Sequence, residues 1–392
     1  MTLILPDAPE IRRTTSALRT TDLLALAGAA TASIGLTSVV FALLAPFNGA
    51  LGFVILAWVL FLGLYTLLVS FDEDRPTVRD RAATVAVHSL AFVVLLALVV
   101  IVVYTFFRAR EALVHSNFFT QDLSNTGPLD PITSGGIVQA IIGTLQQITL
   151  GLLISVPLGL ICALFLSEVP GTFSRFVRTI SEAMTALPSI VAGLFIYAAW
   201  IIVLGQGKSG LAASLALSVM MLPIIIRAAD VVLRLVPGSL KEASLALGTS
   251  QWRTVWHVTL PTARSGLATA IILGAARGIG ETSPVLLTAG YTASTNLNPF
   301  QGAHTSLPLA AFTLVQSPES AQIARGFGAA ATLLVLVLAL FVIARTLGGR
   351  GPGELTKRQR SRRTAGSTAD LARFDRRPSA QSDHDLIGSI RS

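Results

Sequence analysis

An all-helical, polytopic membrane protein with about eight spanning helices is the fold that this sequence predicts. Of its 392 residues, 52% are hydrophobic and only 13% are charged, whereas soluble domains carry about a quarter charged residues. Long uncharged runs alternate with short polar segments. The first run, from Leu23 to Phe71, is long enough for two spans of about 20 residues each. The single cysteine, Cys162, excludes an internal disulfide framework.

The order of apolar runs and turn signals gives the expected elements. Pro46 and Gly49 interrupt the first run and divide it into two helices. We expect eight helices, at Leu23–Ala45, Leu51–Phe71, Ala82–Phe107, Ile137–Leu166, Ile180–Leu204, Leu211–Ile226, Ser265–Ala289 and Ile323–Ala344. Five polar loops would join the later elements, at Asp72–Arg81, Arg108–Gly136, Glu168–Arg178, Arg227–Arg264 and Tyr291–Ala321. Because Thr144, Gln146 and Gln147 make the fourth helix polar, we expect it to face other helices.

The placement of Lys and Arg predicts the orientation in a plasma (inner) membrane. With a cytoplasmic N-terminus, only Arg108, Arg110, Lys208 and Arg325 would lie outside, and Arg277 would lie within a helix. Both termini and the loop at 227–264 are therefore expected in the cytoplasm. The tail at 347–392 is basic and poor in aromatic residues, so we expect it to be disordered and to contact anionic lipid rather than nucleic acid.

A polar stretch from Lys241 to Pro261 stands out between the apolar runs. Its start fits a short helix with one polar and one apolar side, and the plainest interpretation is an amphipathic connector on the membrane surface. Its order is Glu-Ala-Ser, three residues, Gly, nine residues, Val, one residue, Leu-Pro. This order resembles the EAA loop of ABC-importer permeases, with serine at the third position. The matching positions are Glu242, Ala243, Ser244, Gly248, Val258, Leu260 and Pro261. The resemblance implies a coupling helix that docks on an ATPase subunit.

A pair of opposite charges lies in the seventh predicted helix. A charge near the bilayer centre costs about 2.5–3.5 kcal/mol, and Arg277 and Glu281 are four residues apart, so they can pair on one helix face. Gly274, Gly278 and Gly280 would let a neighbouring helix or a ligand approach closely. One interpretation is a self-neutralised pair that fixes helix packing. The other is a functional site, because ionisable residues inside a membrane are functional by default.

This segment also resembles a known family. Its order Arg-x-x-Gly-Glu-Thr-Ser-Pro is similar to the Arg-x-x-Gly-Glu-Thr-Ala-Pro signature of phosphate-importer permeases of the PstA type, with Ser283 in place of alanine. The run Leu187–Leu194 resembles another stretch of that family, and Thr305–Leu309 resembles its short external helix. The resemblance implies a type I, MetI-like permease core at 137–346 with the coupling loop at 227–264. Before it would lie an extension, 1–136, with three spanning helices and an external loop.

The resemblance further implies one half of the membrane pathway of an ATP-driven phosphate importer. The substrate pathway would include Arg277, Glu281, Thr282 and Ser283. The implied partners are a homologous permease of the PstC type, a dimeric ATPase of the PstB type and an extracytoplasmic phosphate-binding protein of the PstS type. ATP hydrolysis would belong to the ATPase, so the chain itself is expected to be neither an enzyme nor a cofactor protein. Another oxyanion, molybdate or sulfate, is the alternative cargo.

Other classes of protein lack their motifs in this sequence. Gly207-Lys208-Ser209 resembles the end of a P-loop, but Ile202 occupies the place of the first glycine. The five histidines are scattered without metal-ligand spacing. Neither Gly-x-Ser-x-Gly nor His-Glu-x-x-His occurs. A membrane enzyme or signalling protein is therefore a weaker hypothesis.

Overall fold

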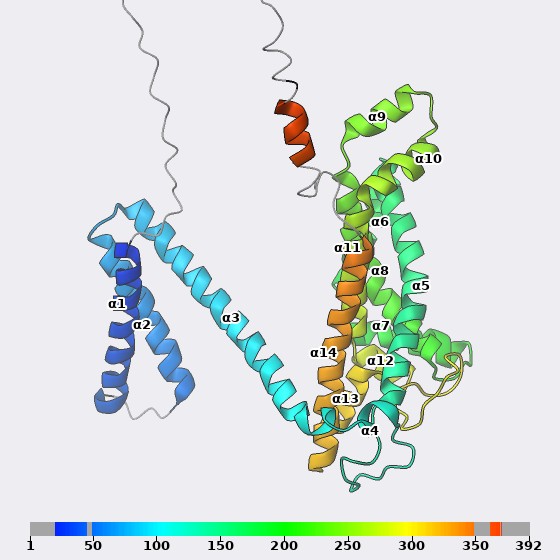
Figure 1. The fold of residues 1–392 in the computed structure, drawn as a ribbon, viewed down its shortest axis with the longest axis horizontal. Helices are drawn as coiled ribbons and strands as arrows, with labels where there is room; N and C mark the ends of the chain where they lie inside the picture. The colour runs from blue at the N-terminus through cyan, green and yellow to red at the C-terminus, as the bar shows by residue number, and fades with distance from the viewer. Residues whose placement is uncertain (1–19, 45–48, 349–360, 369, 371–392) are drawn as a thin grey trace, which may run out of the picture. The chain divides into compact units, whose positions relative to one another are not determined.

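The computed structural model describes residues 20–44, 49–348, 361–368 and 370. The described residues are helical or irregular, and the chain forms two compact units, Met1–Val103 and Tyr104–Ser392 (Figure 1). The turn expected around Pro46 and most of the basic tail lie outside the described residues. Within the tail, residues 361–368 are helical and exposed, which the expectation of disorder did not include.

The first unit is built on two paired helices. Helix α1 (Thr20–Val39) continues as a wider π-helical segment, η1 (Val40–Leu44), and packs against α2 (Ala50–Ser70). Their small core contains Ala29, Tyr65 and Val69. The unit also includes the first part of α3 (Arg75–Leu113), where Arg81 binds Asp22 and Glu73, the latter at 2.9 Å. Most other large apolar side chains here are exposed, as lipid-facing helices require.

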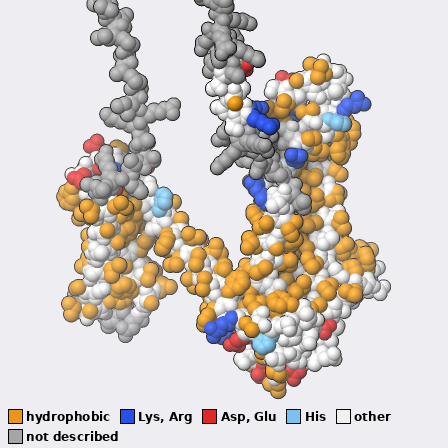
Figure 2. All heavy atoms as spheres, in the orientation of Figure 1, with side chains coloured by type: hydrophobic (Ala, Val, Ile, Leu, Met, Phe, Trp, Pro, Cys, Tyr) orange, Lys and Arg blue, Asp and Glu red, His pale blue; other side chains and the backbone are white. Residues whose placement is uncertain are grey.

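The second unit holds the remaining elements. In chain order they are α4 (Asn117–Thr120), α5 (Val138–Glu168), α6 (Thr172–Thr185), α7 (Ser189–Ile196), η2 (Tyr197–Val203), α8 (Gly210–Arg234), α9 (Gly238–Ala246), α10 (Gln251–Thr254), η3 (Val255–Thr259), α11 (Leu260–Ile279), α12 (Ser283–Thr288), α13 (Leu307–Val315) and α14 (Ser320–Gly348). Within this unit, α9 and α10 lie at the end where α5 and α8 finish, and α4 and the long loops lie at the other end (Figure 1). Figure 2 shows hydrophobic side chains along its length and charged ones toward its ends.

Helices α5 and α8 form the centre of the second unit along a seam of small residues. Gly151, Ser155 and Gly159 recur every four residues on α5. The Ser218 hydroxyl of α8 donates to the Gly151 carbonyl at 3.2 Å. A Cβ on Gly159 would come within 2.8 Å of Ile225. Small residues let helix backbones approach closely where no hydrophobic effect drives helices together. The seam therefore fixes the two helices that carry the site described below.

The number of spans agrees with the expected fold class. Among the described residues, seven helices are long and apolar enough to cross a membrane, or up to eight if one bent pair counts as a single span. That pair is α6 followed by α7 and η2, with a bend of 104°.

The expected straight helix at Ile180–Leu204 is therefore wrong. Helix α6 already begins at Thr172, inside the expected loop Glu168–Arg178, and ends at Thr185. Pro188 precedes α7 in an extended conformation, with ψ at 138°. Proline also disfavours helical geometry in the residue before it, here Leu187. The chain has to turn at this point, and the apolar composition alone did not reveal the turn.

The expected helix at Ser265–Ala289 is also wrong in both its start and its continuity. A helical segment runs from Gln251 to Ile279 through α10, η3 and α11. It ends at Gly280, and α12 starts again at Ser283. Pro284 has no amide proton to bond to the carbonyl of Gly280, which favours a break in the helix at this point.

Three further expected elements differ from the structure. Helix α3 begins seven residues before the expected start at Ala82 and ends six residues after the expected end at Phe107. Helix α8 extends to Arg234, eight residues beyond the expected end at Ile226, so the expected loop Arg227–Arg264 is mostly helical. The expected loop Tyr291–Ala321 contains α13, whose Leu307, Leu309 and Ala310 are buried. A short helix is thus present where Thr305–Leu309 indicated one.

Candidate functional site

The expected coupling helix is present as α9. It carries Glu242 and Ala243, both exposed, and the half-buried Ser244. In this fully described stretch, α9 buries none of its own residues. Gly248 follows with φ at +81°, a left-handed conformation that glycine adopts without strain, and its amide donates to the Leu245 carbonyl at 2.9 Å. The glycine therefore ends the helix as the sequence indicates.

Ser244 connects α9 to the next helix. Its hydroxyl lies 2.7 Å from the Thr249 hydroxyl and 2.9 Å from the Thr254 hydroxyl. Thr249 also donates to the Ser244 carbonyl at 2.8 Å. An alanine at position 244 could make neither hydroxyl contact. Serine at the third position of the motif thus fastens α9 to α10.

Leu260 and Pro261, the end of the motif, begin α11. Proline is favoured in the first turn of a helix, where its missing amide proton is not needed. Leu260 packs against the buried cluster that includes Ala263 and Leu267. Helices α9, α10 and α11 therefore form one connected path from the motif to Arg277.

Arg277 and Glu281 form the expected ion pair, with Arg277 Nε 3.0 Å from Glu281 Oε1. Arg277 lies in the last turn of α11, and Glu281 lies in the break before α12. The two sides of the pair differ: the Arg277 side chain is 54% exposed and that of Glu281 only 12%. The carboxylate is therefore held inside the chain, while the guanidinium keeps an open face.

Two of the three glycines around Arg277 allow α8 to pack closely against this segment. A Cβ on Gly274 would lie 2.5 Å from Ile225, and one on Gly278 would lie 2.5 Å from Met221, both on α8. A Cβ on Gly280 would meet only atoms of its own segment, 3.9 Å or more away. Close approach of a neighbouring helix is confirmed for Gly274 and Gly278 and not for Gly280.

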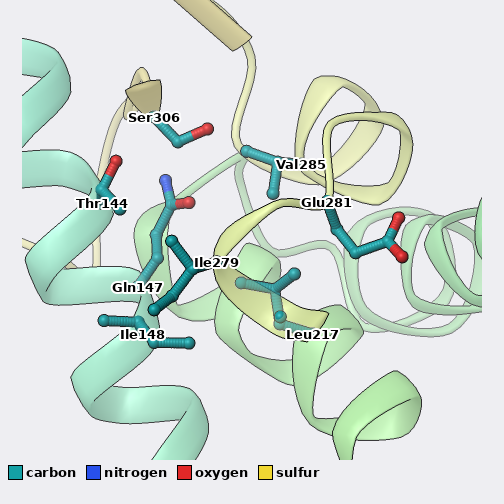
Figure 3. A pocket seen from close by; sticks show the side chains of 9 residues that line it. Thr144, Gln147, Ile148, Leu217, Ile279, Glu281, Val285 and Ser306 are labelled. Carbon is teal, nitrogen blue, oxygen red and sulfur yellow. The ribbon is translucent and has the colours of Figure 1, made fainter. Parts of the chain in front are cut away.

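A small cavity with a mixed polar and apolar lining adjoins Glu281 (Figure 3). Its volume of about 10 Å³ is close to what one water molecule needs. Its polar lining comes from Thr144 and Gln147 of α5 and from Ser306 before α13. The Ser306 hydroxyl is buried and has no hydrogen-bond partner among the described residues. In Figure 3 the Glu281 carboxylate points away from Gln147 and Ser306, so only its stem faces the cavity.

Sequence reasoning identified only part of the lining of this cavity. Thr282 and Ser283 are half-buried next to Glu281, but they do not line this cavity. Thr144, Gln147 and Ser306 were not expected there. The polarity of the fourth expected helix was the available signal, since it indicated that Thr144 and Gln147 face other helices. Nothing in the sequence pairs them with Ser306, because the contact depends on how the loop before α13 folds back: the Leu307 amide donates to Thr144 Oγ1 at 2.7 Å.

The opposite end of the second unit is fastened by two charged side chains. Asp122 accepts hydrogen bonds from the Ser124 hydroxyl and from the amide and hydroxyl of Thr295, and these bonds lower the pKa of its carboxyl from 3.8 to about 2. Arg325, fully buried, donates to the carbonyls of Pro131 and Ser134 at 2.7 and 2.5 Å. Two loops distant in sequence are thereby held together at this end.

Among the described residues, no group of three or more His, Cys, Asp and Glu side chains is placed to hold a metal ion.

Comparisons with known proteins decide the family. A family model described as binding-protein-dependent transport system inner membrane component matches residues 155–348. The phosphate transport system permease protein PstA 1 of Mycobacterium tuberculosis (strain CDC 1551 / Oshkosh) is 38% identical over 271 residues, which are 69% of this chain and 88% of that protein. The chain belongs to the PstA family of permeases. A PstA of Mycobacterium leprae (strain TN) is 36% identical over 264 residues, covering 67% of this chain and 86% of its own length.

Solved structures agree with the fold. A chain of a bacterial alginate ABC transporter, crystallised with an alginate pentasaccharide-bound periplasmic protein, aligns with a TM-score of 0.50 at 14% identity, covering 70% of this chain and 98% of its own. Such low identity shows the fold alone. Membership in the PstA family makes this chain a multi-pass inner-membrane permease component that is not itself catalytic. The expected fold class and family are confirmed.

Proposed function

We propose that this chain is the PstA-type permease subunit of an ATP-driven importer of inorganic phosphate, and that it forms half of the translocation pathway. The carrying observation is the Arg277–Glu281 pair at the break between α11 and α12, which exposes the guanidinium and buries the carboxylate. The relatives named as phosphate permeases support the cargo.

The geometry of the pair suits a transported anion. A conducting site must attract its ion strongly enough to admit it and weakly enough to release it. Arg277 offers a half-open guanidinium, and Glu281, 3.0 Å away, reduces its net attraction. Thr282 and Ser283 add hydroxyl groups to the same segment, where they would bond phosphate oxygens. In this proposal all four residues belong to the pathway.

The exposed surface of α9 and the residue that follows it supports an ATPase as one partner. Leu240, Leu245 and Leu247 are all exposed, Leu247 to 85%, and apolar side chains clustered on a polar segment mark a contact surface. A dimeric ATPase of the PstB type would cover this surface around Glu242–Gly248. A PstC-type permease would supply the other half of the pathway, and a PstS-type binding protein would deliver phosphate from outside.

We also propose the arrangement of the chain in the membrane. The α9–α10 end and both termini would face the cytoplasm, as the placement of Lys and Arg predicts. Residues 137–346 would form the permease core with its coupling loop at 227–264. Residues 1–136 would form an extension, and the basic tail at 347–392 would lie next to anionic lipid.

Uptake by a strain that lacks its own phosphate permease tests this function. We expect the chain, expressed with its neighbouring subunits, to restore uptake of labelled phosphate, and a tenfold excess of unlabelled molybdate or sulfate to leave that uptake nearly unchanged. Strong competition by either oxyanion would instead assign that ion as the cargo. Failure to restore any uptake, with all subunits present in the membrane, would contradict the proposal.

A further inference from the structure

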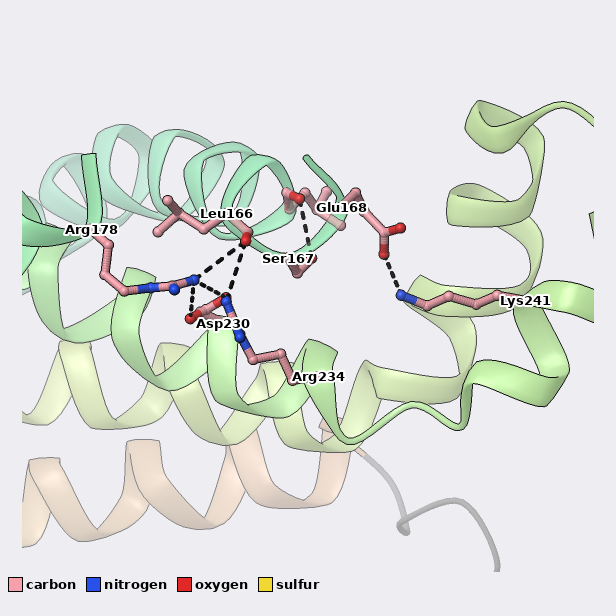
Figure 4. A network of polar contacts seen from close by, with 8 residues as sticks. Leu166, Ser167, Glu168, Arg178, Asp230, Arg234 and Lys241 are labelled. Atoms are coloured by element: carbon pink, nitrogen blue, oxygen red, sulfur yellow. Dashed lines mark hydrogen bonds and ion pairs between the residues drawn. The ribbon is translucent and has the colours of Figure 1, made fainter. Parts of the chain in front are cut away.

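Helix α9 contacts the rest of the second unit through side chains at two distinct places. The first is the hydroxyl cluster of Ser244, Thr249 and Thr254, which leads through α10 into α11. The second is an ion pair to a different helix: Lys241 Nζ lies 2.6 Å from Glu168 Oε1 (Figure 4). Both side chains of this pair are well covered, with 23% and 16% exposed.

The position of Glu168 on α5 is unusual for a carboxylate. Glu168 is the last residue of α5, where the unpaired carbonyls give the helix a partial negative charge. A negative side chain is disfavoured there unless a cation compensates it. Lys241 supplies that cation from α9, so the ion pair explains how Glu168 is accommodated at this end.

The end of α5 is also clamped, so a force on Glu168 would act on the whole helix. The carbonyl of Leu166 accepts hydrogen bonds from Arg178 of α6 and Arg234 of α8, each at 3.4 Å. Asp230 of α8 holds both arginines, with contacts of 3.2 Å and 3.0 Å (Figure 4). A helix end fixed in this way moves as part of a rigid body rather than fraying.

The two attachments of α9 lead to opposite walls of one cavity. Helix α11, reached through the hydroxyl cluster, ends beside Glu281 and carries Gly278 and Ile279. Helix α5, reached through Glu168, contributes Thr144 and Gln147. A displacement of α9 can therefore act on both walls at once.

We propose that Lys241 and Glu168 are positioning residues for transport, and that their ion pair forms a second arm by which α9 moves α5 when the ATPase moves α9. This inference rests on the coupling role proposed above for α9. The first arm consists of the hydroxyl cluster together with the chain itself, and it passes through α10 into α11. The second arm is an ion pair. Exchanging its two residues would reverse the position of each charge and keep the attraction between them.

Charge exchange in the reconstituted complex of all subunits tests the arm. Lys241→Glu and Glu168→Lys each place two like charges together, and we expect each to lower phosphate imported per ATP hydrolysed at least fivefold. Complex yield should stay within twofold of wild type. The double variant restores opposite charges, so its ratio should return to within twofold of wild type. A role in stability alone would lower yield, hydrolysis and uptake together.

Two control variants separate the arm from a general charge effect. Lys241→Arg keeps the cation, and Asp72→Lys reverses an exposed acid in the first unit. Both should leave the transport-to-hydrolysis ratio within twofold of wild type. Single reversals that behave like these controls would overturn the proposal, as would a double variant no better than the singles. If a reversal prevents assembly, Lys241→Gln and Glu168→Gln remove charge without repulsion, and the same loss of ratio is expected.

A distance measurement tests the second arm without measuring phosphate transport. Spin labels at the exposed Leu153 of α5 and Leu273 of α11, in a Cys162→Ser background, report the separation of the two helices. ATP with vanadate should shift this distance in wild type, and each single reversal should change the size of the shift, because α11 then moves without α5. A shift of the wild-type size in both singles, or no shift in wild type, would refute the arm. A normal shift without phosphate uptake would refute the proposed function alone.

Discussion

Arg277 combines two properties that a structural residue would not need together. Its guanidinium is bound to Glu281, which lowers the cost of placing it in an apolar helix. Yet its side chain is 54% exposed on this chain, so the ion pair leaves part of the guanidinium accessible. A pair that only fixed packing would be expected to bury both charges. The asymmetry favours a pathway role over simple helix packing.

Replacing Arg277 tests that role. Arg277→Ala should reduce phosphate uptake to below about 5% of wild type, because one guanidinium supplies the charge and several of the donors for the anion. Arg277→Lys should retain some uptake, since it keeps the charge and loses the planar, bidentate geometry. Membrane uptake assays on complexes of equal yield provide the measurement. Arg345→Ala, at the exposed end of α14, serves as the control, and equal uptake in Arg277→Ala and this control would contradict the role.

Asp122 gives a prediction about pH. Because the Ser124 and Thr295 hydrogen bonds lower its pKa to about 2, the ionised carboxylate stabilises the contact between the two loops. This contribution is complete above the ordinary pKa of about 4 and is lost as the pH falls toward 2. Protection of the Thr295 amide from hydrogen exchange should therefore drop over that interval. In Asp122→Asn, protection should already be reduced at pH 7 and vary little below it; full protection at pH 2 in wild type would be inconsistent with this.

At the level of elements, the sequence predicted those features that depend on composition and residue spacing. Uncharged runs located α1, α2, α5 and α14, and the start of α8, to within a few residues, because every backbone group in a bilayer must be satisfied inside a helix. The motif residues located α9, and their order identified Gly248 as its end. The four-residue spacing of Arg277 and Glu281 predicted their ion pair.

Breaks inside apolar segments could not be predicted in the same way. The 104° bend between α6 and α7 and the gap between α11 and α12 both lie inside segments that were expected to be single helices. Pro188 and Pro284 mark them, yet Pro157 and Pro223 lie inside α5 and α8 without ending either helix. A proline's effect depends on whether packed neighbours support the freed carbonyl, and that is a tertiary property. The sequence also could not predict that Ser306 lines the cavity, because that too depends on tertiary packing.

The end of α9 provides the element-scale prediction. Gly248→Val should lower uptake strongly and leave ATP hydrolysis by the complex active, because a β-branched residue is strained at a φ of +81° and would distort the turn into α10. Gly248→Asn should be tolerated to within about threefold, since asparagine enters the left-handed region more readily. The ratio of uptake to hydrolysis in proteoliposomes separates these outcomes. Similar ratios for the two variants would show that the backbone conformation at this turn does not matter for coupling.

For the whole molecule, the division into two compact units predicts which helices the permease core needs and which it can lose. Helices α1 and α2 pack on each other around their own small core, and the family model matches only within the second unit. The permease core therefore has its own buried clusters, which α5, α8, α11 and α14 complete without residues from α1 or α2.

Deleting residues 2–72, which removes α1 and α2 and an even number of spans, should leave the orientation of the remaining helices unchanged. We expect assembly with the partner subunits and phosphate uptake within about twofold of wild type. Deleting α14, which contributes to the packing of two of the core clusters, should abolish assembly. Loss of assembly in the first deletion would show that the N-terminal helices belong to the working core.

The length of α11 has a mechanical consequence. Its 20 residues span about 30 Å at roughly 1.5 Å per residue, which is close to a hydrocarbon thickness of about 30 Å. Such a rod, pivoting by only about 5° near one tip, sweeps its far tip through roughly 3 Å given that length. Angular changes too small to notice in a superposition are thus enough to open or close a passage of atomic width.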